Sequence, residues 1–146
     1  MYPQPRVEDF INRNFIPVKI HTKEQPQQFE RFRAQWTPTI VFLDSDGAER
    51  HRFEGFLPTD DFLAQLHLGK AKTAFGRQQF KDAEREFQRI VEELPQTDAA
   101  PEALYWAGVA RYKGTGDASA LADTAAGFRQ RYQQSTWAKK ASVWAA

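Results

Sequence analysis

Residues 36–43 have the sequence Trp-Thr-Pro-Thr-Ile-Val-Phe-Leu, and this stretch decides the fold. Its last four residues form a continuous apolar run, which is typical of a strand with both faces covered. We therefore expect a central strand over residues 39–43. Residues 44–47, Asp-Ser-Asp-Gly, form a turn signal, and residues 49–55 can return as an antiparallel partner. The sequence therefore predicts a β-hairpin here.

Upstream of the hairpin, the pattern alternates between helix and strand. Apolar residues at helical spacing predict a helix over residues 5–14. Alternating apolar residues predict a strand over residues 15–20, and Pro17 favours a sheet edge because proline donates no ladder hydrogen bond. An apolar stripe predicts a second helix over residues 27–35.

Every signal after residue 58 is helical. The first of these helices has Asp60 and Asp61 in its first turn, where negative charge is favourable, and it should break near Gly76. The next has a regular apolar face from Phe80 to Leu94 and ends before Pro95. Three more helices are expected: one over about residues 100–112, one using Leu121, Ala125, Phe128 and Tyr132, and a short last one that Ser135 caps.

This order of elements, with Thr37-Pro38 directly before the apolar strand, resembles the second part of a thioredoxin fold. In that family a Thr-Pro dipeptide with a cis peptide bond stands at this place, so the resemblance implies a cis bond between Thr37 and Pro38. Residues 2–7, 14–18 and 37–44 look like a bacterial thioredoxin-like group whose members continue into tetratricopeptide-like helices.

The expected fold class is therefore α/β, with two units that share one helix. A partial thioredoxin-like fold covers residues 1–70, and an α-helical tetratricopeptide-like region covers residues 64–146. The helical region has some support of its own. Ala83, Phe87 and Pro95 have the spacing of the small residue, aromatic residue and proline of a tetratricopeptide repeat.

The main departure from the thioredoxin pattern concerns the active site. Family members carry a Cys-x-x-Cys pair at the start of the helix that here ends near Asn14, whereas this chain has no cysteine. Thiol–disulfide exchange needs a thiolate, which no other side chain replaces. A fragment, a wrongly assigned start and a degenerate copy all fit this pattern.

We therefore expect a protein-binding or scaffold module with no redox chemistry in this chain. The alternative is a truncated thiol–disulfide oxidoreductase whose catalytic Cys-x-x-Cys lies upstream. A purely structural fragment without a partner is a third reading of the same residues.

The first candidate binding site is the loop that contains the proline. In thioredoxin-like proteins the backbone of this loop pairs with bound peptide, so the resemblance implies a peptide site at Trp36, Thr37, Pro38 and Thr39. In the alternative interpretation Pro38 only shapes a turn and Trp36 fills the core.

The second candidate site lies on the helical region. Stacked helix pairs of this class present a concave face that holds peptides. The repeat register points Lys72, Phe75, Tyr105 and Tyr112 into such a groove. The alternative is that these aromatic residues pack between helices or onto the sheet.

The titratable residues give no pattern of a catalytic or metal site. The three histidines, His21, His51 and His67, do not pair at metal-ligand spacing, so we expect surface or packing roles for them. Asp44 and Asp46 lie in the predicted turn, where aspartate normally bonds its own backbone. We expect no catalytic residue, no metal and no cofactor in this chain.

Charge and hydropathy narrow the class of partner. The net charge is +1 and the basic residues are spread along the chain, so we expect no nucleic acid. No stretch reaches the roughly 18 apolar residues of a membrane span, and the first six residues lack an apolar signal core. The expected partner is a protein or peptide, with no membrane association, and the expected location is cytoplasmic.

The resemblance also predicts a gap in the sheet. In the thioredoxin fold another strand lies between the two that we assign to residues 15–20 and 39–43. Without it, we expect either direct pairing of these two strands or an open edge that drives self-association.

Overall fold

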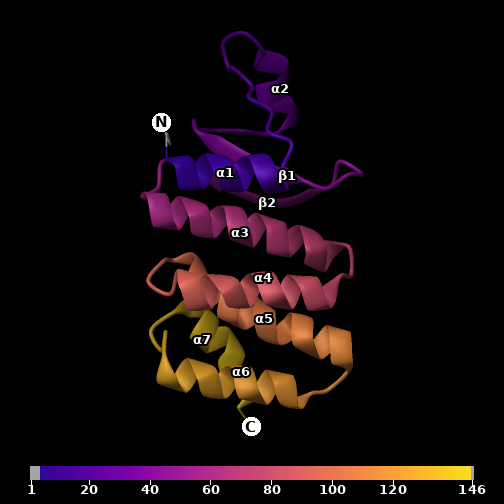
Figure 1. Cartoon of the computed structure of the whole chain (residues 1–146), viewed down its shortest axis with the longest axis vertical. Helices are drawn as coiled ribbons and strands as arrows, with labels where there is room; N and C mark the ends of the chain where they lie inside the picture. Colours follow the sequence, from indigo (N-terminus) through magenta and orange to yellow (C-terminus); the bar gives the residue numbers. More distant parts are fainter. Residues whose placement is uncertain (1–3, 146) are drawn as a thin grey trace.

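A computed structural model describes residues 4–145 (Figure 1). Residues 1–3, at the start of the first predicted unit, and residue 146, at the end of the second, lie outside the described residues. Helices dominate the described range, which holds one sheet of two strands. The elements are α1 (Pro5–Asn14), α2 (Pro26–Arg31), β1 (Thr39–Leu43), β2 (Glu49–Glu54), α3 (Thr59–Gly76), α4 (Phe80–Glu93), α5 (Ala99–Thr115), α6 (Ser119–Gln130), α7 (Thr136–Ala141) and a 3₁₀ turn (Ser142–Trp144).

The hairpin forms as predicted, with β1 and β2 antiparallel and Phe42 opposite His51. One face of the hairpin is aromatic. The Phe42 ring lies 5.4 Å from the His51 ring and 6.3 Å from that of Phe53, and Phe53 meets Phe62 of α3 edge-on at 5.6 Å. This face buries the hairpin against α3.

The turn of the hairpin is organised by the Asp44 carboxylate. The backbone N–H groups of Asp46 and Ala48 donate to its Oδ1 at 2.9 and 3.0 Å, and Arg50 Nε donates to its Oδ2 at 2.8 Å. Burial opposes ionisation of Asp44, but these three donors outweigh it and hold the pKa of the carboxyl below its usual value. Gly47 supplies the left-handed residue of the turn at φ 83°. The predicted backbone-binding role of Asp44 is confirmed.

Two predictions about the sheet are wrong. The segment over residues 15–20 is not a strand, and β1 has β2 as its one strand neighbour among residues 4–145, so it is not central. Ile16 and Val18 are 93% and 78% exposed. A segment of alternating apolar residues becomes a strand only if a neighbouring strand pairs with its backbone N–H and C=O groups, and none does so here. The predicted direct pairing of the two strands is therefore also wrong.

Helix α2 is shorter than the predicted helix over residues 27–35, since it ends at Arg31. Arg33 adopts a left-handed conformation, with φ 53°, which stops the helix. Arg52 of β2 donates from Nη2 to the Phe32 carbonyl at 2.6 Å. The hairpin therefore supplies a hydrogen-bond donor to a backbone carbonyl at the C-terminal end of α2.

Helix α3 lies at the centre of the molecule, with α1 and the hairpin on one side and α4 on the other (Figure 1). Gly69 of α3 permits a close approach, because a Cβ at this position would overlap the Phe42 ring. Val7 of α1 is fully buried in the same core. The apolar core is continuous from Val7 of α1 to Ala110 of α5.

The remaining helices stack in chain order, α4 on α3, α5 on α4 and α6 on α5. Ala83 and Phe87 of α4 are fully buried. Tyr132 lies beyond the end of α6, contrary to prediction, at φ 61°. Its hydroxyl donates to the Pro95 carbonyl at 2.6 Å, which joins the ends of α4 and α6. Ser135 caps α7 as predicted, accepting the N–H of Ala138.

Within residues 4–145, no helix combines the length and apolar character that crossing a membrane requires.

Candidate functional site

The loop before β1 contains a cis peptide bond and is held in place by hydrogen bonds. The Thr37–Pro38 peptide bond is cis, which confirms the prediction. Thr39 Oγ1 donates to the Trp36 carbonyl at 2.6 Å, and the Pro38 carbonyl accepts the N–H of Gly55 at 2.8 Å. The loop is thus held both by its own residues and by the strand end that faces it.

This loop presents apolar surface to solvent. The Trp36 side chain is 66% exposed, so the alternative in which Trp36 fills the core is wrong. Phe56, which follows Gly55 directly, is 61% exposed, and sequence reasoning missed it. Its only signal was an aromatic residue between a glycine and the proline that precedes α3.

The edge of β1 next to this loop has unused backbone groups. The Pro38 carbonyl and the Asp44 N–H both bond toward the β2 side of the hairpin. Since alternate residues of a strand point to opposite edges, the backbone groups of Thr39 and Val41 face away from β2. Within residues 4–145 no other strand takes them. Trp36, cis-Pro38 and this edge follow one another along the chain, and we call them the loop–edge surface.

Residues 2–70 match the model of a protein family described as a thioredoxin-like domain. The chain thus carries a thioredoxin-like domain. No curated protein and no solved structure matches the chain. The match ends within α3, so the helices that follow lie outside the thioredoxin-like domain, and their likeness to tetratricopeptide repeats stays a prediction.

Most of the four residues of the predicted helical groove contact other side chains of the helical region. Lys72 forms a 2.7 Å ion pair with Glu102 of α5. Phe75 lies edge-on to Trp106 at 5.4 Å. Tyr105 stacks on the Trp144 ring at 4.8 Å and meets the Trp106 and Trp137 rings at 5.3 Å. Tyr112 is the exposed member of the four, at 39%. Three of the four side chains therefore make contacts within the molecule, and the helical groove stays a prediction.

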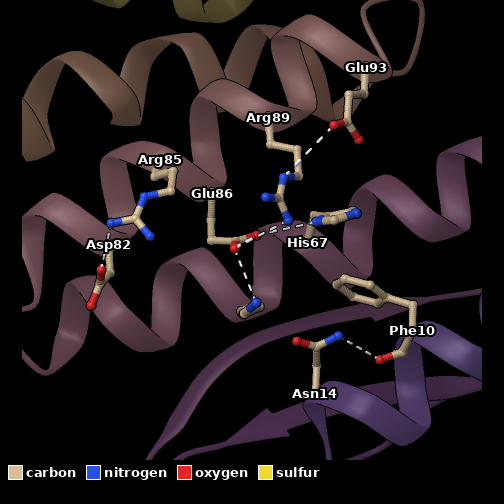
Figure 2. A network of polar contacts seen from close by, with 9 residues as sticks. Phe10, Asn14, His67, Asp82, Arg85, Glu86, Arg89 and Glu93 are labelled. Carbon is tan, nitrogen blue, oxygen red and sulfur yellow. Dashed lines mark hydrogen bonds and ion pairs between the residues drawn. The ribbon is translucent and has the colours of Figure 1, made fainter.

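A buried carboxylate joins the thioredoxin-like domain to α4. Glu86 Oε2 lies 3.4 Å from His67 Nδ1, and its Oε1 lies 3.1 Å from Lys70 Nζ and 3.7 Å from Arg89 Nη1 (Figure 2). Burial raises the pKa of Glu86, but the hydrogen bonds from His67 and Lys70 and the charges of Lys70 and Arg89 outweigh it and lower the pKa to about 2. The Phe10 ring lies 4.1 Å from the His67 ring. The predicted packing role of His67 is confirmed.

Residues 4–145 bring no three His, Asp or Glu side chains together in an arrangement that could hold a metal ion. A carboxylate with the pKa of Glu86 is fully ionised near neutral pH and is a weak base, so this network is suited to holding helices together rather than to acid–base catalysis.

Proposed function

We propose that the chain is a protein-binding module that holds an extended segment of a partner on the loop–edge surface. The observation that carries this proposal is the exposed Trp36 beside the unpaired edge of β1. An extended peptide can add as a strand to such an edge, with main-chain hydrogen bonds to Thr39 and Val41. Tryptophan is enriched among the anchors of protein interfaces.

The proposal includes no redox role for this chain. The chain contains no cysteine, and neither Ser nor Thr replaces a thiolate in disulfide exchange. The helical groove is a less favoured site for a partner, because Phe75 and Tyr105 make ring contacts within the molecule. A cytoplasmic location remains a prediction.

Substitution of Trp36 tests the proposed surface. The probe is a dye-labelled, carboxymethylated polypeptide that stays unfolded, and fluorescence anisotropy measures its dissociation constant. We expect Trp36→Ala to weaken binding about thirtyfold, because losing an aromatic anchor costs about 2 kcal/mol. Val143→Ala is the matched control, since Val143 is also exposed and lies in the C-terminal 3₁₀ turn. The C-terminus lies at the opposite end of the molecule from α2 (Figure 1).

Two outcomes would contradict the proposal: no measurable binding of the unfolded probe, or equal affinity of the wild type and Trp36→Ala. The alternative occupant of the edge is a second copy of the chain, as the open edge predicts. Light scattering on the same samples tests for it, because a dimer that forms with rising concentration would favour a second copy over a peptide segment as the occupant.

The rival function is a thiol–disulfide oxidoreductase whose Cys-x-x-Cys lies upstream, and the match to a thioredoxin-like domain favours it as the second candidate. We expect this chain not to accelerate the reduction of insulin by dithiothreitol, because it offers no sulfur nucleophile. A turbidity assay against a denatured control checks this. An in-frame Cys-x-x-Cys in the codons before Met1, together with activity of the extended chain, would favour the oxidoreductase.

A further inference from the structure

A row of polar side chains crosses from the hairpin to the helical region. His51 Nε2 of β2 lies 2.7 Å from Gln65 Oε1 of α3, and His51 Nδ1 lies 3.4 Å from Lys72 Nζ of α3. Lys72 in turn forms its 2.7 Å ion pair with Glu102 of α5. The backbones of β2 and α5 do not pack on each other, so these side chains form a link between them. We call the row the His51–Glu102 bridge.

The donors and acceptors of the bridge fix the charge of His51. The Gln65 amide oxygen only accepts, so His51 Nε2 must carry the proton. The Lys72 ammonium only donates, so His51 Nδ1 must accept with its lone pair. The bridge is therefore complete only with a neutral imidazole. A proton on Nδ1 would remove the acceptor of Lys72 and place a second cation against the ammonium.

The surroundings of His51 favour its neutral form. Burial lowers the pKa of His51 and the Lys72 charge lowers it further, while Gln65, Glu102 and Glu49 oppose this with a smaller effect. Aromatic rings of the hairpin lie on either side, with Phe42 at 5.4 Å and Phe53 at 6.2 Å. These are the charged groups and rings that face His51 from β1, β2, α3 and α5.

We propose that the His51–Glu102 bridge is a proton-sensitive latch that couples the β-hairpin to α5 and opens when His51 is protonated. The inference goes beyond the proposed function, since it concerns how the two parts of the chain are held together. The pKa of His51 is lowered in the folded protein, so the folded chain binds fewer protons there than the unfolded chain. The latch contributes fully to the free energy of unfolding above about pH 6.5, the pKa of histidine in the unfolded chain. This contribution declines as the pH falls below that value.

Nuclear magnetic resonance of the histidine rings, assigned with single His→Gln variants, tests the latch directly. We expect the His51 ring to titrate below about pH 6.5, the usual value of an imidazole. Lys72→Met should move the His51 midpoint upward, because it removes the adjacent cation. A purely structural Lys72 would not produce this shift.

Hydrogen exchange gives the second readout. Between pH 7.5 and pH 5.5, and after correction for the intrinsic pH dependence, we expect a several-fold loss of protection in β2 and at Glu102 of α5. This loss should be absent in His51→Gln and retained in His21→Gln. The proposal fails if His51 titrates at or above about pH 6.5, if Lys72→Met leaves the His51 midpoint unchanged, or if His51→Gln keeps the same loss of protection.

Discussion

Replacing Phe87 with alanine is expected to lower the free energy of unfolding by about 3–5 kcal/mol, the usual cost of deleting a buried phenylalanine ring. Phe87 is fully buried on α4, which lies between α3 and α5. Both neighbours would lose contacts at once, and a helix between two others cannot easily move to close the cavity. The loss is a large share of the roughly 5–15 kcal/mol that stabilises a typical domain.

A guanidinium chloride titration followed by circular dichroism measures this change. Gln88→Ala is the matched control, because Gln88 is the next residue of the same helix and is exposed. We expect its effect to be within about 0.5 kcal/mol. Similar midpoints for the two variants would mean that α4 is not the packed centre of the helical region.

Glu86→Gln is expected to destabilise the protein by about 3 kcal/mol at pH 7, the free energy that corresponds to a pKa lowered from 4.5 to about 2. The substitution keeps the size of the side chain and removes the negative charge that His67, Lys70 and Arg89 surround. Three positive or polar groups would then share a neutral acceptor in a buried place.

The sign of the pH dependence follows from the lowered pKa. The contribution of Glu86 to the free energy of unfolding is complete above about pH 4.5 and is lost as the pH falls through about 2. The reason is that the folded state then has to bind the proton that the unfolded state already holds. Urea titrations at pH 7 and pH 3 should therefore show a smaller difference between wild type and Glu86→Gln at the lower pH. Glu92→Gln, an exposed neighbour on α4, is the control. An equal difference at both pH values would contradict the assignment.

The hairpin and the long helices could be predicted because their signals are local. The Asp-Gly turn, the apolar run of β1 and the period of α4 each act over a few residues, and the structure follows them. The proline loop could be placed for the same reason, since the cis bond depends on a dipeptide at a recognisable position.

What the sequence could not supply is long-range pairing. The segment over residues 15–20 has a strand pattern, but whether it becomes a strand depends on a neighbour that its own residues do not encode. The His51–Glu102 bridge joins residues far apart in the chain, and no spacing predicts it. Exposure of Phe56 and packing of Tyr105 are likewise decided by elements that meet only in the folded protein.

The position of α3 limits where this sequence could recombine with another sequence and still fold. The match to a thioredoxin-like domain ends at residue 70, but Leu68 and Ala71, on either side of that point, are both fully buried in one continuous core. Recombination at this boundary would leave half a helix on each product, with its apolar side open to solvent. A different C-terminal region would therefore have to supply a helix that keeps the α3 face toward the hairpin.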